Sequence, residues 1–185
     1  MSFPIYDLDN APEKSKPVLR ELKQTFGFVP NIAGALAASP TLLAGFFSVF
    51  KNAHSGSLDE AQIQVLLLTN AVTNRSTWPV AFHTFLALKN GVSAQDVQAI
   101  RHGTQPADPK HAALSGLAKR LIETRGHATQ TDLDSFLGAG FTQPQVLEVI
   151  LVVAASTITN YVATVARPAL EEAFQAHAWT PDVVR

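Results

Sequence analysis

The sequence predicts an all-α fold. Apolar residues recur at helical spacing in successive segments, and proline, serine or aspartate precedes these segments while glycine often follows them. No segment shows the period-two alternation, bounded by turn residues, that is typical of a strand. With 185 residues, 46% hydrophobic and 16% charged, the chain is long enough for one well-packed core. We therefore expect a single domain over residues 1–185.

The N-terminal part is predicted to form an arm followed by three short helices. Residues 1–15 mix aromatic and aliphatic residues with proline and aspartate, which favours an extended arm. Pro17 suits the first turn of a helix that Gly27 ends. A small helix is expected over 32–38, and Ser39-Pro40 supplies the N-cap and first residue of a third helix.

The segment 58–92 is predicted to be a buried helical hairpin at the centre of the domain. Its first helix, capped by Ser57 or Asp59, is too continuously apolar for a surface helix. The polar elbow 73–77 leads into a second helix, Trp78 to Lys89.

Five further helices complete the predicted bundle: 94–102, 110–124, 129–137, 142–161 and 168–178. Thr142 and Gln145 form a capping-box pattern at the start of the longest of them. This helix and the last one would make a second buried hairpin, 142–176. Helices that are apolar on nearly every face need covering, so we expect a symmetric homo-oligomer.

Composition excludes several classes of function. A net charge of -1 without a basic face argues against a nucleic-acid partner. The absence of cysteine excludes disulfides, thiolate metal sites, iron–sulfur clusters and thiol nucleophiles. The continuous apolar runs are shorter than the roughly 20 residues that span a bilayer, so we expect no membrane segment and a cytoplasmic location.

Short motifs are spread over most of the chain. They are FGFVPN at 26–31, Ser39-Pro40, the buried helix that leads through Asn74 to His83, Gly91–Ser93, Gly140–Thr142 and Asn160-Tyr161. Together they resemble the alkylhydroperoxidase D and carboxymuconolactone decarboxylase superfamily, and most closely its peroxidase-related branch. The resemblance implies an all-helical bundle without a cofactor, assembled as a trimer or a hexamer.

Peroxidase members of this family carry the pattern E-x11-C-x2-C-x3-H, in which the cysteines reduce the peroxide and Glu and His relay protons. The corresponding residues here are Gln64, Ser76, Pro79 and His83, so the resemblance implies that only the histidine is kept. A hydroxyl or a proline ring cannot pass through sulfenic acid and disulfide, and an amide does not exchange protons near neutral pH. We therefore expect thiol peroxidase activity to be absent.

The candidate catalytic residues are His83, Ser76 and Gln64. His83 is either an acid–base group beside a pocket or a core histidine with its hydrogen bonds satisfied. Ser76 is alternatively only the cap of the following helix. Trp78, Pro79 and Phe82 would line a pocket next to His83, although aromatic residues at helical spacing are commonly plain core.

The other titratable residues show no metal-binding spacing. No histidine forms an i, i+4 pair with another histidine, so the usual zinc spacing is absent and no metal site is expected. These remaining histidines lie near predicted helix ends or loops: His54, His102, His111, His127 and His177. Glu148 is a carboxylate within an apolar helix, and both a solvated and a core-facing position remain open.

Three functions compete. The first is a cofactor-free enzyme that uses His83 as an acid–base group on a small organic acid or lactone. The second is a non-catalytic oligomeric protein that binds a small apolar ligand. The third is the peroxidase activity of the family. An open pocket with Ser76 and Gln64 turned toward His83 would favour the enzyme, whereas a space filled by Trp78 and Phe82 would disfavour it.

Overall fold

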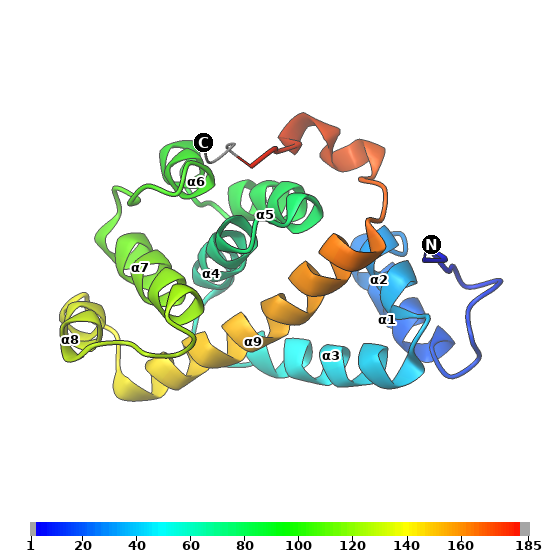
Figure 1. Cartoon of the computed structure of the whole chain (residues 1–185), viewed down its shortest axis with the longest axis horizontal. Coiled ribbons are helices and arrows are strands. Elements are labelled where there is room, and N and C mark those ends of the chain that lie inside the picture. The colour runs from blue at the N-terminus through cyan, green and yellow to red at the C-terminus, as the bar shows by residue number, and fades with distance from the viewer. Residues whose placement is uncertain (1–2, 182–185) are drawn as a thin grey trace.

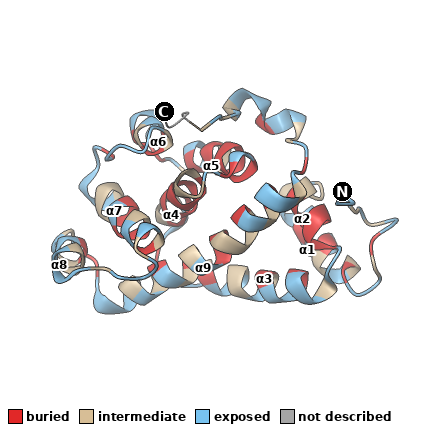
Figure 2. Ribbon diagram, viewed as in Figure 1, coloured by how far each residue is buried: buried red, intermediate tan, exposed pale blue. Residues whose placement is uncertain are grey.

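A helical hairpin of α4 (Glu60–Thr73) and α5 (Thr77–Lys89) forms the centre of the fold in the computed structural model, which describes residues 3–181 (Figure 1). A capping box starts α4: the Asp59 carboxylate accepts from the Gln62 N–H, and the Gln62 side chain accepts from the Asp59 N–H. All residues from 63 to 71 are buried, and the α5 side chains facing them are buried too (Figure 2). The hairpin therefore lies in the core of the fold.

Helices from the second half of the chain cover the hairpin. The long α9 (Gln143–Ala166) and α7 (Pro109–Glu123) pack against α4, and α6 (Ala94–Arg101) packs against both hairpin helices. The short α8 (Gln130–Gly138) packs on α7 at one end of the molecule (Figure 1). Each fully buried Leu or Val in these contacts stabilises the fold by about 1.5–3 kcal/mol.

The first three helices form the opposite end of the molecule. They are α1 (Lys16–Phe26), α2 (Asn31–Leu36) and α3 (Pro40–Ala53), and α3 runs along α9 (Figure 1). The described part of the arm, residues 3–15, contains turns and no helix, and it packs on its own chain. The Tyr6 N–H donates to the Gly34 carbonyl at 3.1 Å. A Cβ at position 34 would lie only 2.5 Å from the Tyr6 carbonyl oxygen, so this contact requires glycine.

The predicted all-α class is confirmed, since no strand occurs within residues 3–181. The second predicted hairpin differs from the structure at its C-terminal side. Arg167 adopts the left-handed conformation that ends α9, and the following chain forms only a short 3-10 helix, η1 (Glu172–His177). This segment packs on α5, and Glu171 just before it accepts hydrogen bonds from the Trp78 side chain and from the Asn31 N–H.

The helix α9 is longer than any uninterrupted apolar run in its sequence. It has 24 residues, and an 18-residue window within it has a mean hydropathy of 1.9, so by length and composition alone it is apolar enough to cross a membrane. Apart from Glu148, the polar residues that interrupt its apolar runs are uncharged Gln, Ser, Thr and Asn. A single helix of this kind is weak evidence for a membrane span, and this one packs against α3, α4 and α7.

Candidate functional site

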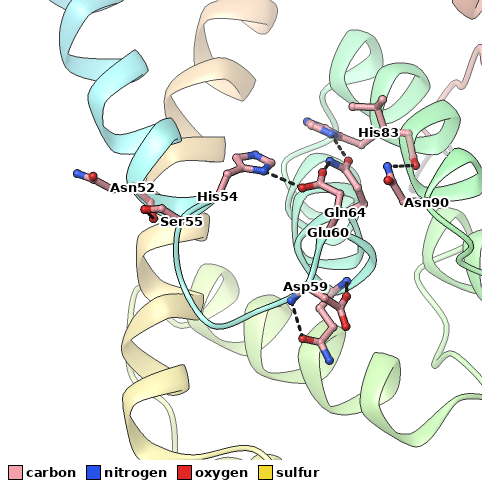
Figure 3. A network of polar contacts seen from close by, with 10 residues as sticks. Asn52, His54, Ser55, Asp59, Glu60, Gln64, His83 and Asn90 are labelled. Carbon is pink, nitrogen blue, oxygen red and sulfur yellow. Dashed lines mark hydrogen bonds and ion pairs between the residues drawn. The ribbon is translucent and has the colours of Figure 1, made fainter. Parts of the chain in front are cut away.

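His83 lies on α5 and faces Gln64 on α4. Only 7% of His83 and 1% of Gln64 are exposed. The imidazole Nδ1 lies 3.0 Å from the Gln64 Oε1 (Figure 3). Both side chains therefore come from the buried faces of the central hairpin, where packing holds them in place.

The polar contacts continue from Gln64 to the end of α3. The Gln64 amide Nε2 donates to Glu60 Oε1 at 2.6 Å, and the second oxygen of Glu60 lies 2.9 Å from His54 Nδ1 (Figure 3). Glu60 is one helical turn before Gln64, so the two side chains share a face of α4. His54 follows the last residue of α3, and its Nε2 is buried without a partner among the described residues.

Burial determines the charge of His83, the most buried titratable group of this network. It lowers the pKa of His83 to about 3, with a smaller contribution in the same direction from His54 and an opposing one from Glu60. Burial raises the pKa of Glu60, but hydrogen bonds from His54 and Gln64 outweigh it and hold that pKa below its ordinary value. At neutral pH the network therefore contains a neutral His83 and an ionised Glu60.

A cavity of about 60 Å³ lies next to His83. Trp78, Pro79 and Phe82 line it from α5, as predicted, and Phe26 and Phe50 face them from α1 and α3. The polar lining residues besides His83 are two residues of α9, Ser156 and Thr159, and both hydroxyls make hydrogen bonds within that helix. The cavity is therefore an apolar space with one imidazole in its wall.

Trp78 and Phe82 form part of the cavity wall as a stacked aromatic pair. Trp78 and Phe82 stack with their ring centroids 5.0 Å apart, and Phe26 meets Phe82 edge-on at 5.5 Å. The Trp78 Nε1 donates to Glu171 Oε2 at 2.9 Å, while Glu171 Oε1 accepts from the Asn31 N–H at 2.6 Å. Glu171 thus ties the C-terminal segment to this wall.

Ser76 does not join His83 and Gln64. It occupies the N-cap position of α5, but its side chain makes no cap hydrogen bond; its Oγ donates to the Asn160 carbonyl at 3.1 Å. Around it lies an amide cluster in which the buried Asn160 Nδ2 and the half-buried Asn74 Nδ2 donate to Asn70 Oδ1 at 2.7 and 2.6 Å. The elbow side chain is therefore used to hold the hairpin against α9.

The remaining candidates have structural roles. Glu148 is half-buried, and its carboxylate accepts from the N–H and hydroxyl of Ser57 at 2.9 and 3.0 Å, which anchors the loop before α4. His111 lies 2.8 Å from the buried carboxylate of Asp96. Within residues 3–181, no three His, Asp or Glu side chains are grouped so that they could hold a metal ion.

A wider groove of about 870 Å³ lies along α7 and α8, away from His83. None of the predicted site residues lines it. Its basic side chains are already engaged: Arg120 pairs with Asp132 at 3.3 Å, and Lys119 donates to the Gly103 carbonyl at 3.2 Å. We therefore take the smaller cavity beside His83 as the candidate site.

Three residues of the site were missed by sequence reasoning: Glu60, His54 and Glu171. Glu60 had a recognisable signal, since a carboxylate four residues before Gln64 shares its helix face. His54 and Glu171 had none, because they reach the hairpin from α3 and from the C-terminal segment.

The chain resembles known proteins in a central segment and in its whole fold. The carboxymuconolactone decarboxylase family model matches residues 40–120. A peroxidase-related protein from Ralstonia eutropha with an alkylhydroperoxidase AhpD core has a TM-score of 0.83 and 17% identity, over 97% of each chain. A peroxidase-related protein from a Silicibacter species has a TM-score of 0.77 and 15% identity, over 96% of this chain and 94% of that one.

A third similar structure is that of the debrominase Bmp8, with a TM-score of 0.76 and 16% identity over 94% of both chains. Another structure of that debrominase contains 2,3,4-tribromopyrrole. No curated protein matches this chain in sequence. At these identities the similar structures establish the fold.

Proposed function

We propose, from the premise that this chain belongs to the carboxymuconolactone decarboxylase and alkylhydroperoxidase D superfamily, that it binds a small apolar molecule beside His83 without redox chemistry. The observation that supports this function is the apolar cavity with a single imidazole in its wall. The chain has no cysteine, so the thiol cycle of the peroxidase branch has no sulfur on which to proceed. Thiol peroxidase activity is expected to be absent.

Binding has better support than acid–base catalysis. A general base works best with a pKa near the operating pH, whereas burial lowers the pKa of His83 to about 3. Its neighbour Gln64 is an amide, and Ser76 is engaged with Asn160. The imidazole therefore has no partner residue that would exchange a proton with a lactone or an organic acid.

The size of the cavity limits the ligand. About 60 Å³ is several times the space that one water needs and far below the 300–1,000 Å³ of sites for drug-sized molecules. A single small ring is the largest occupant expected after modest side-chain movement. The tribromopyrrole in the similar debrominase is also a single ring, which supports this choice of ligand class.

Binding of small rings should depend on the free volume beside His83. We expect benzene, phenol or cyclopentanol to shift the NMR signals of Trp78 and His83 in a saturable way. Ala155→Val adds two methyl groups to the cavity wall and should weaken this binding at least tenfold. Ala87→Val is the matched control, because Ala87 is equally buried but does not line the cavity.

The proposed function is wrong if no ring of this panel binds. It is also wrong if Ala155→Val and Ala87→Val weaken binding to the same extent, because the effect would then arise from overpacking rather than from a filled cavity.

A second copy of the chain is proposed to cover the exposed face of α9. Four large apolar side chains lie within one stripe of that helix at 44% exposure or more: Leu147, Ile150, Tyr161 and Val165. The stripe carries no charged group that would favour water, and the sequence resemblance implies a trimer or a hexamer.

The oligomer is expected to depend on this stripe. The double variant Leu147→Glu, Tyr161→Glu should run as a monomer in size-exclusion chromatography with light scattering, since two charges would be buried unpaired in the contact. Leu88→Glu, which alters an exposed apolar residue of α5, should leave the assembly intact. A monomeric wild-type protein would contradict the proposal.

A further inference from the structure

We propose that the cavity selects small rings that carry a hydrogen-bond donor, because Glu60 and Gln64 fix the His83 side chain as an acceptor. This inference rests on the proposed function and names the ligand class. It also assigns Glu60 as a positioning residue that acts through Gln64 without touching the ligand.

The first step concerns the amide of Gln64. An ionised carboxylate can only accept hydrogen bonds, so the group that lies 2.6 Å from Glu60 Oε1 must be the amide NH₂ of Gln64. His54 binds the other oxygen of Glu60 at 2.9 Å and keeps the carboxylate in place. The Gln64 carbonyl is thereby turned toward His83.

The second step concerns the tautomer of His83. The Gln64 Oε1 can only accept, so the Nδ1 that lies 3.0 Å away must carry the proton. A neutral imidazole has one proton, and Nε2 is therefore a lone-pair acceptor. No described residue makes a hydrogen bond to this nitrogen, and His83 is part of the cavity wall.

The ligand class follows from that lone pair. A hydroxyl or a ring N–H can donate to Nε2, whereas a ketone, an ether or a carboxylate would turn its own lone pairs toward it. The second arrangement leaves a buried nitrogen unpaired, which costs as much as a lost hydrogen bond. A small ring alcohol should therefore bind about tenfold more tightly than the ketone of the same size.

Cyclopentanol and cyclopentanone form a matched pair for this test. By NMR titration, we expect the wild type to prefer the alcohol about tenfold. Gln64→Glu places a carboxylate directly on Nδ1, which favours the imidazolium and turns Nε2 into a donor. The preference should then fall to near unity or reverse, while the exposed control Gln95→Glu should keep it.

The tautomer can be measured without a ligand. In ¹⁵N NMR spectra we expect His83 to carry its proton on Nδ1 in the wild type. Glu60→Gln should introduce the Nε2–H tautomer, because a glutamine at position 60 can offer either its oxygen or its nitrogen to Gln64. The same variant should reduce the preference for the alcohol.

The two proposals fail in different ways. Binding of the ketone as tightly as the alcohol, or a wild-type His83 protonated mainly on Nε2, overturns donor selection while leaving ligand binding intact. If neither ring nor any ring of the larger panel binds, the binding function fails, and donor selection fails with it even if the spectrum shows the Nδ1–H tautomer.

Discussion

Lowering the pH from 7 to 4 is expected to destabilise the protein by about 3 kcal/mol through His83 alone. Burial lowers the pKa of His83 from 6.5 to about 3. Between these two values the unfolded chain binds a proton that the folded chain does not. The free energy of unfolding therefore falls as the pH drops below 6.5, and the loss is complete near pH 3.

Chemical denaturation at pH 7, 5.5 and 4 measures this effect. His83→Gln should lose most of the His83 contribution to the pH dependence, since an amide does not titrate. The variant should retain a smaller acid loss, because Glu60 and Asp96 also have lowered pKa values and lose stabilisation as they are protonated.

His127→Gln is the matched control, because His127 is exposed. Its unfolding free energy should follow that of the wild type across the pH range. If His83→Gln shows the full wild-type loss between pH 7 and 4, then His83 is not held neutral in the folded state.

Asn70→Ala is expected to lower the free energy of unfolding by about 2–4 kcal/mol. Asn70 is fully buried on α4. It accepts from Asn74 and Asn160, and its Nδ2 donates to the Val153 carbonyl of α9 at 3.0 Å. Truncation removes the acceptor that the buried Asn160 amide and the half-buried Asn74 amide share, leaves the Val153 carbonyl without this donor, and opens a space where the hairpin meets α9.

Urea unfolding at pH 7 provides the measurement, with Asn52→Ala as control, because Asn52 is an exposed residue of α3. The control should change stability by less than about 0.5 kcal/mol. A loss below about 1 kcal/mol for Asn70→Ala would mean that water replaces the lost contacts and that the cluster is not dry.

The position of the central hairpin could be predicted because its signals are local. The continuous apolar run of α4, the cap at Asp59 and the pairing of His83 with Gln64 all follow from residues within one segment of the chain. Helical periodicity places each residue on a face of its own helix, and the short elbow between α4 and α5 makes these two helices neighbours, so the sequence indicated this pairing.

The function of Ser76 could not be predicted in the same way. Its position before α5 indicated a cap, but its hydroxyl binds a carbonyl of α9 that lies 84 residues away. Periodicity describes which face a residue occupies on its own helix and contains no information about the helix that packs there. The same limit applies to His54 and Glu171.

By itself, the sequence determined the helical class and the absence of cysteine, and it predicted a buried hairpin with one histidine, His83, on its second helix. Only the tertiary structure decided what that histidine can do. Its pKa, its tautomer and the cavity beside it depend on Glu60, on His54 and on aromatic side chains from α1 and α3. These groups influence His83 only because they lie within a few ångströms of it or of its neighbours. Those distances arise from the packing of segments that are far apart in the sequence.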